Sequence, residues 1–576
     1  MALNGTLSIT RTRHRRSWPN LHRVAEPSQE LSPLERRLVT AVAEDSPLVA
    51  SDVVPTGTPD QANTVRARVL RDILLGRLVD HPGPRGVRLH GVYLSGELDL
   101  LNMHVNSALH LSRCRLAQPV LLLDAHLPYL AIIDSHLRGL EADRLRVDSN
   151  LLLAGSVVDG VGSDCAVRLS GAQVGGQVSL TGATLRAGAN CGLQADGLGV
   201  GGDLLLRNGF RAQAGGDRGA VRLLGARISG NLDCDGSIIT ATGGPALNLE
   251  RTEVGGNLYL RGARTSGHAP AGVVLVGARI TGQVSATGAE FSSTGGPAML
   301  ADGAQTGGDV YVNGGFGAHG GVRLVGARIG GHLDCTDGHA RVDDPGALAL
   351  DLRFATVGAM LRLSRSFTNP GSAELPFGLM AFDGLTYPTP PVGMDRGEWT
   401  VVLADRTPSY AAQPYQQLAG AYRAAGREDD ARRVLIAQQR DLLRRGDLSA
   451  LARLRHRVLG VLLGYGYQSW RSLVALVITM ALAVAFVLAL AASSAAVTTP
   501  AKPGQPAVPC STVDQVALGV DLALPLIDTG AKDRCELAPT RAAEETYVAV
   551  GWLFQILGWS FATLFVAGYT GLVRKA

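Results

Sequence analysis

The stretch VGGNLYLRGARTSGHAPAGVVLVGARITGQVSA, residues 254–286, decides the fold of this chain. Within it, apolar residues alternate with other residues over short runs, and each run meets a glycine or a glycine pair. Alternation with a period of two predicts short strands that bury one face. Glycine supplies the positive φ or the close backbone approach that a tight corner needs. The stretch therefore predicts short strands joined by tight corners.

The first half of this pattern recurs along the chain at nearly constant spacing. Its copies begin at Val174, Val200, Ile228, Val254, Ile280, Thr306, Ile329 and Val357, at intervals of 26, 28, 26, 26, 26, 23 and 28 residues. One such unit cannot bury its own apolar face, so the units must stack, at the usual inter-strand distance of ~4.8 Å. The predicted fold class is mainly β, a β-helix (solenoid), whose handedness the pattern leaves open.

Composition agrees with stacked coils of small aliphatic residues. The 72 glycines among 576 residues exceed average usage, and aromatic residues make up only 5% of the chain. From Val87 to Leu153 the double glycines are missing while spaced leucines continue, which predicts tighter coils of the same solenoid. This stretch resembles the pentapeptide-repeat and related β-helix proteins, although its five-residue period is irregular. The net charge of +4 is too small to indicate a nucleic-acid partner.

Helical segments are expected on both sides of the solenoid, which we place at residues 87–365. Residues 32–45 and 62–79 read as amphipathic helices of an N-terminal cap (31–86), with Ser32 as N-cap and Pro33 at the first helical position. Residues 1–30 are expected to be a disordered tail. A Pro-rich linker (366–411) leads to an Arg-rich helical connector (412–471), in which Gly426 separates two helices. The connector resembles one tetratricopeptide-type unit, and we interpret it as a spacer rather than a peptide-binding groove.

Two apolar segments, residues 472–497 and 547–573, are long enough to cross the roughly 30 Å hydrocarbon layer as transmembrane helices. The alternative, two buried core helices, fits such long runs less well. From Arg423 to Arg471 there are 11 arginines against five acidic residues, whereas residues 494–545 contain four basic and seven acidic residues. The positive-inside rule then predicts a multi-pass plasma-membrane protein. Both termini, including the tail 574–576, would be cytoplasmic and the loop 498–546 extracytoplasmic.

Cys510 and Cys535 lie in that predicted outer loop, where an oxidising compartment would let them form a disulfide. The alternative is two free thiols. The apolar segment between them is too hydrophobic for an idle loop, so we expect an interfacial helix or a re-entrant segment. The other five cysteines lie in the glycine-rich body at spacings that match no zinc motif.

Three further patterns invite a chemical interpretation. Residues 197–202 match GxGxxG, but they fall at a repeat corner rather than in a βαβ unit, so no dinucleotide site is expected. Asp233-Cys234 and Asp334-Cys335 repeat an LDC motif, yet about four coils separate them, which favours Cys as core and Asp on the outer face over a metal site. Five arginines recur beside the GA corners: Arg222, Arg227, Arg279, Arg323 and Arg328. They could form a basic ladder that binds an acidic partner, or a solvated ladder in which acidic residues alternate with the arginines.

The sequence contains no nucleophile elbow, HExxH or Walker loop. We therefore predict no catalytic residue, cofactor or metal site, and we expect that the protein is not an enzyme. The segments DLALPLIDTG (521–530) and LGWSFATLFVAGYTGLVRK (557–575) resemble actinobacterial membrane proteins that join β-helix repeats to two C-terminal spans. Some of these are labelled membrane-associated oxidoreductases, but no residue of this chain corresponds to a cofactor motif, so the resemblance implies the label alone. The leading hypothesis is a scaffold that contacts the bilayer and a protein partner or a second copy. The alternatives are an oligomeric channel or transport component and, from the label alone, an oxidoreductase.

Overall fold

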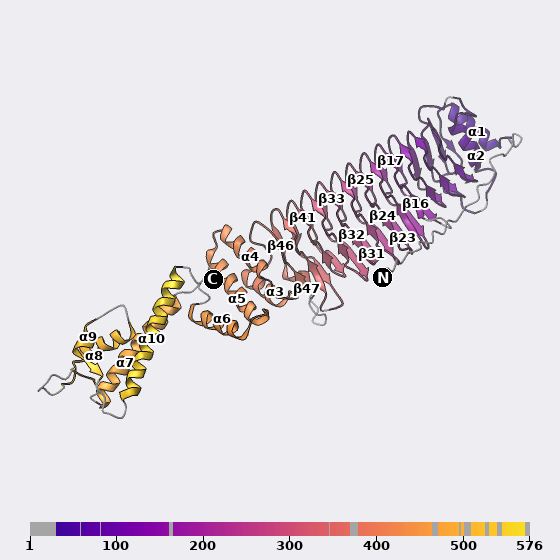
Figure 1. Ribbon diagram of the computed structural model, residues 1–576. Helices are drawn as coiled ribbons and strands as arrows, with labels where there is room; N and C mark the ends of the chain where they lie inside the picture. Colours follow the sequence, from indigo (N-terminus) through magenta and orange to yellow (C-terminus); the bar gives the residue numbers. More distant parts are fainter. Residues whose placement is uncertain are drawn as a thin grey trace, which may run out of the picture.

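The computed structural model describes residues 30–570, except 58, 81, 161–164, 345, 369–377, 464–469, 495–496, 500–507, 525–528 and 538–543. The expected disordered tail lies almost wholly outside this range. The chain forms a long β-solenoid with helices at both ends, followed by a separate bundle of helices beyond its C-terminal end (Figure 1). The predicted fold class is therefore confirmed.

Four parallel sheets form the sides of the rod, and each complete coil contributes one short strand to each of them in the order A, B, C, D, while the coils at the two ends are incomplete. Sheet A consists of β1 (Leu48–Val49), β3 (Val87–His90), β6 (Leu109–Ser112), β10 (Leu130–Ile133), β14 (Leu151–Leu152), β18 (Val178–Ser179), β22 (Leu204–Leu205), β26 (Leu232–Asp233), β30 (Leu258–Tyr259), β34 (Val284–Ser285), β38 (Val310–Tyr311), β42 (Leu333–Cys335) and β46 (Leu361–Leu363).

Sheet B forms the next side of the rod. It consists of β2 (Thr64–Arg66), β4 (Tyr93–Ser95), β7 (Arg115–Leu116), β11 (His136–Leu137), β15 (Val157–Gly160), β19 (Thr184–Ala187), β23 (Arg211–Ala214), β27 (Ile238–Ala241), β31 (Arg264–His268), β35 (Glu290–Thr294), β39 (Gly317–His319) and β43 (His339–Arg341).

Sheets C and D complete each coil. Sheet C consists of β5 (Leu98–Asp99), β8 (Val120–Leu121), β12 (Leu140–Glu141), β16 (Cys165–Arg168), β20 (Cys191–Gln194), β24 (Val221–Arg222), β28 (Leu247–Asn248), β32 (Val273–Val274), β36 (Met299–Leu300), β40 (Val322–Arg323), β44 (Leu348–Asp351) and β47 (Leu379–Ala381). Sheet D consists of β9 (His126–Leu127), β13 (Arg146–Val147), β17 (Gln173–Val174), β21 (Gly199–Val200), β25 (Arg227–Ile228), β29 (Glu253–Val254), β33 (Arg279–Ile280), β37 (Gln305–Thr306), β41 (Arg328–Ile329) and β45 (Thr356–Val357).

Register explains both the core and the glycine pairs. Each inward aliphatic residue stacks on its equivalent one coil away, as Leu204 does on Leu232 and Leu258, all fully buried. At the corner between sheets D and A the backbones of successive coils nearly touch. A Cβ on Gly201 would lie 2.1 Å from the carbonyl oxygen of Gly175, so glycine avoids a clash at this corner. Most coils have glycine at this position, and Ser229 and Thr281 occupy it in two of them.

Helices and two short strands cap the first coil. Helix α1 (Pro33–Ala43) begins at the N-cap Ser32, which forms a capping box with Glu35, and Pro33 is the first helical residue, as expected. The second predicted helix is shorter than expected. Residues 64–66 form β2 instead, which pairs with β4, and α2 (Ala67–Leu74) follows. The strand forms because its alternating pattern completes sheet B above the first coil.

The described part of the segment expected as a Pro-rich linker (366–411) belongs to the rod instead, and residues 369–377 of that segment lie outside the described residues. The short 3-10 helix η1 (Arg365–Thr368) follows the last full coil, β47 pairs with β44, and further bridges join Thr386 to Thr356 and Val392 to Arg362. Helix α3 (Arg396–Asp405) then packs on this partial coil, with Trp399 5.9 Å from Phe382 between ring centroids. Prolines are compatible with this end because it has no further coil to pair with.

The predicted helical hairpin is confirmed as α4 (Ala412–Ala424) and α5 (Glu428–Arg445), separated by Gly426 at φ 74°. It is fastened to the last coil: Gln413 donates to the carbonyl oxygen of Leu385 at 3.0 Å, and Gln417 donates to that of Tyr387 at 2.6 Å. Helix α6 (Ala450–Leu463) continues towards the bundle. The connector is thus a C-terminal cap of the solenoid as well as a spacer.

We call the last part of the chain the membrane unit. It comprises α7 (Trp470–Ser494), β48 (Val497–Thr498), α8 (Thr512–Ala523), α9 (Ala531–Arg534), β49 (Glu536–Leu537) and α10 (Glu544–Tyr569). Within α7 and α10, residues 470–492 and 549–567 are long and apolar enough to cross a membrane. The first span ends earlier than predicted, because Val497 pairs with Leu537 in a two-stranded sheet.

Candidate binding face of the solenoid

Sheet B carries a row of polar side chains that runs the length of most of the rod. The strands pair in register, so one outward residue per coil falls in line: Asp159, Arg186, Gln213, Thr240, Ser266, Ser292, His319 and Arg341. We call these eight residues the sheet B row. Seven inter-strand steps of ~4.8 Å give it a length of about 34 Å.

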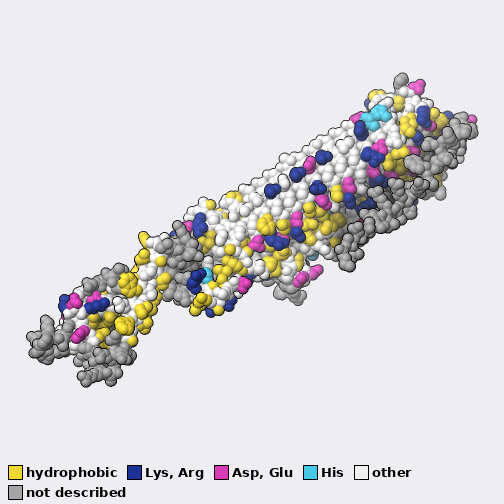
Figure 2. Space-filling view, in the orientation of Figure 1, with side chains coloured by type: hydrophobic (Ala, Val, Ile, Leu, Met, Phe, Trp, Pro, Cys, Tyr) yellow, Lys and Arg dark blue, Asp and Glu magenta, His cyan; other side chains and the backbone are white. Residues whose placement is uncertain are grey.

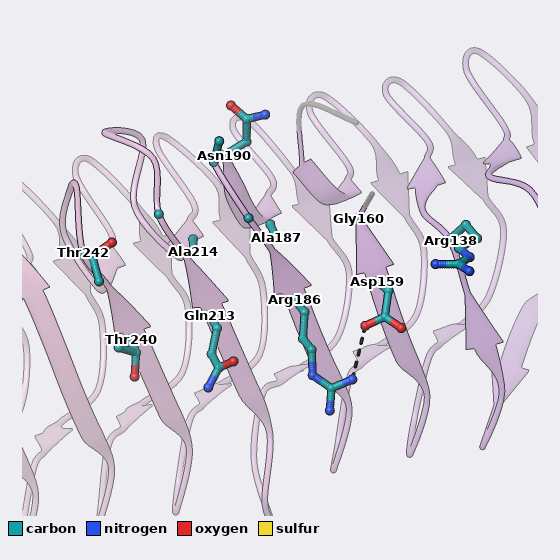
Figure 3. A pocket seen from close by; sticks show the side chains of 13 residues that line it. Arg138, Asp159, Gly160, Arg186, Ala187, Asn190, Gln213, Ala214, Thr240 and Thr242 are labelled. Carbon is teal, nitrogen blue, oxygen red and sulfur yellow. Dashed lines mark hydrogen bonds and ion pairs between the residues drawn. The ribbon is translucent and has the colours of Figure 1, made fainter. Parts of the chain in front are cut away.

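The first of two hollows over this row has a volume of about 930 Å³ and is lined by residues of β15, β19, β23 and β27 together with the loops that follow them. Figure 3 shows Asp159, Arg186, Gln213 and Thr240 on successive strands, with Asn190 on a loop beside them. Arg186 pairs with Asp159 at 3.2 Å between Nη1 and Oδ1. The side chains of Gln213 and Thr240 make no hydrogen bond to other described residues, so their polar atoms are free to meet a ligand.

The second hollow, of about 670 Å³, adjoins the first because Thr240 lines both. Three polar atoms at its walls are enclosed and have no hydrogen-bond partner among the described residues: Thr265 Oγ1, Ser293 Oγ and Arg341 Nε. Enclosed polar atoms without partners are rare in folded proteins. Beside them, burial and then the charge of Arg341 lower the pKa of His339 below its ordinary value, although Glu290 acts in the opposite direction. Arg264, Glu290, Arg341 and Asp343 all line this hollow, so it contains charges of both signs.

The five arginines of the predicted basic ladder do not share one face, so that interpretation is corrected. Arg222 and Arg323 lie on sheet C, where they pair with Asp196 and Asp302 at 2.9 and 2.7 Å. The other three, Arg227, Arg279 and Arg328, lie on sheet D. The GA corner separates the two sets, because sheet C precedes each corner and sheet D follows it.

On sheet D the arginines alternate with other residues rather than forming a basic strip. Glu253 lies between Arg227 and Arg279 in register and pairs with both, at 3.4 Å each. Figure 2 shows dark blue and magenta side chains interspersed along the visible side of the rod. This is the solvated, interleaved arrangement that the sequence also allowed.

The repeated Asp-Cys pairs lie four coils apart, on β26 and β42, and cannot share an ion. Cys234 and Cys335 are fully buried in the core, and burial first, then the neighbouring aspartates, raise the pKa of each thiol. Asp233 faces outward and pairs with Arg207 at 2.9 Å. Within the residues that the structure describes, no cluster of three or more His, Cys, Asp and Glu side chains is placed to hold a metal ion.

The GxGxxG match is a corner of the solenoid. Gly197 has φ 66°, Leu198 is buried, and Gly199 and Val200 form strand β21. Strand β22 of sheet A follows it directly, where a dinucleotide fold would place a helix. No phosphate-binding helix N-terminus is therefore formed at these glycines.

Two disulfides are present, one of which the sequence suggested. Cys510 joins Cys535 in the membrane unit, with Cα atoms 6.2 Å apart. Cys165 joins Cys191 between neighbouring strands of sheet C, with Cα atoms 4.6 Å apart. Sequence reasoning missed the second bond, although the two residues are one repeat, 26 residues, apart. Equal phase in a stacked repeat was the signal that could have found it.

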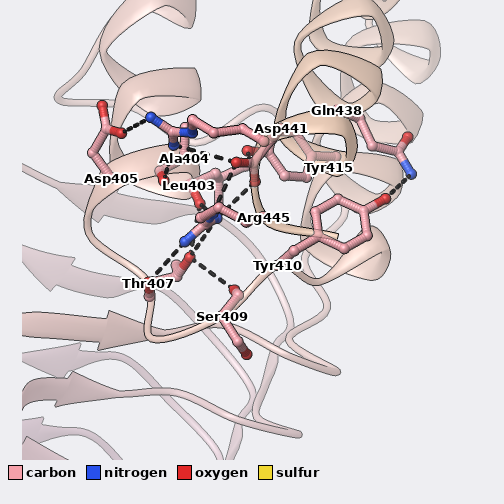
Figure 4. Close-up of polar contacts among 11 residues, drawn as sticks. Leu403, Ala404, Asp405, Thr407, Ser409, Tyr410, Tyr415, Gln438, Asp441 and Arg445 are labelled. Atoms are coloured by element: carbon pink, nitrogen blue, oxygen red, sulfur yellow. Dashed lines mark hydrogen bonds and ion pairs between the residues drawn. The ribbon is translucent and has the colours of Figure 1, made fainter. Parts of the chain in front are cut away.

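The C-terminal cap is held by a buried polar network around Asp441, whose side chain is 1% exposed (Figure 4). Tyr415 donates its hydroxyl to Asp441 at 3.0 Å, and Arg445 donates to the same carboxylate at 2.6 Å. Arg445 also donates to the carbonyl oxygens of Leu403 and Thr407, at 2.8 and 2.9 Å. The network ties α5 to both α4 and the end of α3.

In the membrane unit, α8 packs closely against both long helices. A Cβ on Gly519 of α8 would lie 2.6 Å from Cα of Val484 in α7, and one on Gly558 of α10 would lie 1.8 Å from the carbonyl oxygen of Ala523. Val484 and Gly558 both lie near the middle of their helices. Asp521 of α8 is 2% exposed and accepts hydrogen bonds from the backbone and hydroxyl of Thr529.

Comparison with known proteins identifies no relative: no protein-family model, curated protein or solved structure matches this chain. The functional argument therefore rests on the geometry of the rod, its caps and the membrane unit.

Proposed function

We propose that this protein is a membrane-anchored scaffold, in which the cytoplasmic solenoid presents a rigid face to a protein partner or to a second copy. The observation that carries this proposal is the continuity of the rod: one hydrophobic core extends from Leu34 in α1 to Leu435 in α5. A rod with one continuous core is stiff, because its packed coils cannot bend independently, so residues along its surface keep fixed positions relative to one another.

The charge distribution supports the proposed orientation. Of the 11 arginines from Arg423 to Arg471, ten precede the first span and Arg471 lies at its start, and the acidic segment 494–545 separates the two spans. Helix α6 leads into the first span with exposed Leu451 and Leu454 beside Arg453 and Arg455. Such a helix suits the interface of a bilayer with anionic headgroups. We therefore expect both termini and the whole rod on the cytoplasmic side.

Photo-crosslinking in native membranes tests the scaffold. A photoreactive residue would replace Gln305 on sheet D, Asn248 on sheet C or Arg264 on sheet B in the full-length protein. A scaffold predicts crosslinks to one defined protein, or to a second copy, from one sheet and not from the others. The same crosslinks should be lost when unlabelled full-length protein is added in excess. Equal labelling from all three sheets, or no crosslink from any, contradicts the proposal.

A second candidate function, an oligomeric channel or transport component, is favoured by one observation, the mid-span contacts of α8. Those contacts with Val484 and Gly558 fit a re-entrant helix that enters the bilayer between the spans. Buried Asp521 then lies at membrane depth, where ionisable residues usually serve ion or proton pathways. Liposomes containing the full-length protein should pass cations in a flux assay, and the variant Asp521→Asn should reduce that flux. Absence of flux removes this candidate and leaves the scaffold.

A further inference from the structure

The two long helices of the membrane unit, α7 and α10, pack side by side and expose their other sides (Figure 1). On α7, every exposed residue between Leu473 and Leu490 is aliphatic. The polar side chains of Ser472 and Thr479 are buried on the opposite side of the helix. This arrangement is typical of a helix whose outer side faces lipid tails, because polar groups inside a membrane usually point into the protein.

Helix α10 has the reverse arrangement. Its packed side contains Gly551, Phe554 and Gly558, which contact residues of α7 and α8. Its open side carries the residues with polar groups, in a stripe that we call the outer stripe: Trp552, Gln555, Trp559, Thr563 and Val566. At 3.6 residues per turn these five residues lie within an arc of about 80°. Gln555 is half-buried and the other four are exposed.

The outer stripe places unpaired polar groups at membrane depth. Counted from Ala549 at 1.5 Å per residue, Gln555 lies about 9 Å and Trp559 about 15 Å into the span, so Trp559 is near the middle of the hydrocarbon layer. Neither side chain has a hydrogen-bond partner among the described residues. Tryptophan favours the membrane surface, and polar side chains within a membrane usually bond to a neighbouring helix. The stripe therefore fits a contact with another helix better than a contact with lipid.

We propose that the outer stripe joins α10 to the same helix of a second copy, as a parallel dimer within the membrane. Two copies insert in the same orientation, so their helices can pair about a two-fold axis along the membrane normal, and each residue then meets its own equivalent. A glutamine amide has both donors and an acceptor, so Gln555 can pair with itself across that axis. Trp552, Trp559 and Val566 recur every seven residues, the spacing that keeps a seam between two helices continuous.

This dimer rests on the membrane anchoring proposed above, but it does not depend on what the rod binds. It also differs from the proposed contacts of the rod, because the residues that form it lie within the second span.

Disulfide crosslinking of the full-length protein in native membranes tests the dimer. Val566→Cys introduces a thiol into the outer stripe, and oxidation with copper phenanthroline should join two copies, because equal positions meet across the two-fold axis. The matched control is Leu553→Cys. The two residues are 56% and 53% exposed, but Leu553 lies about 140° round the helix from Val566. The unchanged protein shows any crosslinking by the native cysteines.

Energy transfer between labelled full-length copies in liposomes tests the polar contact. Gln555→Leu keeps a side chain of similar size but removes the amide. It should raise the dissociation constant of the dimer about fivefold, as expected for the loss of one hydrogen bond between helices. Ser560→Ala is the control, because Ser560 lies outside the stripe and its hydroxyl already donates to the carbonyl oxygen of Ile556 at 2.7 Å. Its dissociation constant should change less than about twofold.

Extraction with alkaline carbonate separates failure of the dimer from failure of the membrane anchor. Protein that resists extraction should give a covalent dimer with Val566→Cys and little with Leu553→Cys. The dimer is overturned, and the anchor is not, if resistant protein gives no dimer with Val566→Cys, crosslinks only to a different protein, or crosslinks equally at both positions. An unchanged dissociation constant in Gln555→Leu overturns it as well. If carbonate releases the protein, the anchor fails and the dimer fails with it.

Discussion

The solenoid and the membrane unit bury apolar surface by different means. In the solenoid every coil repeats one register, so the same backbone contact, such as Gly201 against Gly175, occurs at corner after corner. In the membrane unit, single contacts hold the packing: Gly558 against Ala523, Gly519 against Val484, and one disulfide. We therefore expect a substitution at a close contact to affect the stability of the two regions differently. A changed coil has equivalent contacts in the coils on either side, whereas the contacts of the membrane unit do not repeat, so a changed contact there has no equivalent beside it.

The largest effect is expected from glycines at these close contacts. Gly558→Ala would force its Cβ into the carbonyl oxygen of Ala523, so α8 must move away, at a cost of about 3 kcal/mol or more. Its matched control is Gly551→Ala on the same helix, where the nearest atom lies at an ordinary 3.6 Å. Thermal unfolding in detergent should show a large loss for the first variant and little change for the second. Equal stabilities would contradict the packing of α8.

The solenoid offers the same comparison within one corner. Gly201→Ala meets the carbonyl oxygen of Gly175 at 2.1 Å, whereas Gly197→Ala meets nothing within 4 Å and bears only the strain of φ 66°, about 1 kcal/mol. Hydrogen exchange should show that Gly201→Ala opens the adjoining coils and leaves the membrane unit unchanged. If Gly201→Ala instead lowered the protection of backbone amides along the whole rod, the prediction that only the adjoining coils open would be contradicted.

A smaller effect is expected at the N-terminal cap, where Arg66 Nε donates to the almost fully buried carboxylate of Glu35 at 2.7 Å. Burial alone would raise the pKa of Glu35, but the hydrogen bonds from Arg66 and the backbone outweigh it and lower the pKa below its ordinary value. Arg66→Ala should therefore destabilise the cap by about 3 kcal/mol, because it removes the ion pair of a buried carboxylate and leaves only its hydrogen bonds from the backbone. Arg37→Ala, which removes an exposed arginine of α1, is the control.

The sign of the pH dependence follows from that lowered pKa. The native state binds the proton of Glu35 less readily than the unfolded state does. Its contribution to stability is therefore complete above the unfolded pKa of about 4.3 and is lost as the pH falls through the lower folded pKa. In the protein with Arg66→Ala, hydrogen exchange of the first coils should lose this acid dependence. A cap that weakens instead as the pH rises would contradict the assignment.

The two disulfides test the proposed placement of the regions. Cys510–Cys535 closes a loop in the outer segment, and its loss should cost about 3 kcal/mol. Cys165–Cys191 lies in the rod, where a reducing cytoplasm would keep both thiols reduced in the cell. Trapping thiols in intact cells and counting them after denaturation should find the first pair oxidised and the second reduced. The reverse result would place the rod outside.

The smallest effect is expected on the surface of sheet D. Glu253 is about half exposed and pairs with Arg227 and Arg279. Glu253→Gln should change the free energy of unfolding by less than about 1 kcal/mol, because such pairs are screened by water and salt. Chemical denaturation should show no resolvable shift beyond that value. A larger loss would mean that the exposed ladders, and not the buried core, hold the coils together.

The sequence predicted the repeating part of the fold well, because a stacked coil repeats one environment. The corners at Val174, Val200 and Val254, the cap at Ser32 and the hairpin at Gly426 followed from local chemistry. It predicted less where contacts join distant residues. The division of the arginines between two sheets and the last partial coil depend on which residues face each other across coils, and no local pattern reports that.

The candidate site shows the same limit. Each residue of the sheet B row is an ordinary polar residue in its own coil, and only the register brings Gln213, Thr240 and Ser266 into line. The Cys165–Cys191 bond likewise needed the phase of the repeat rather than a cysteine motif. Sites built across coils can be found from sequence only after the units have been aligned to one another.

Cysteine accessibility in intact cells tests the central claim, a cytoplasmic rod tethered by two spans, most directly. Cys114, Cys234 and Cys335 are buried, and so are Cys165 and Cys191. An exposed cysteine introduced as Val513→Cys in the outer segment or as Arg264→Cys on the rod can therefore be labelled selectively. A membrane-impermeant maleimide should label Val513→Cys in intact cells and Arg264→Cys only after the membrane is opened. Labelling of Arg264→Cys in intact cells would contradict the account.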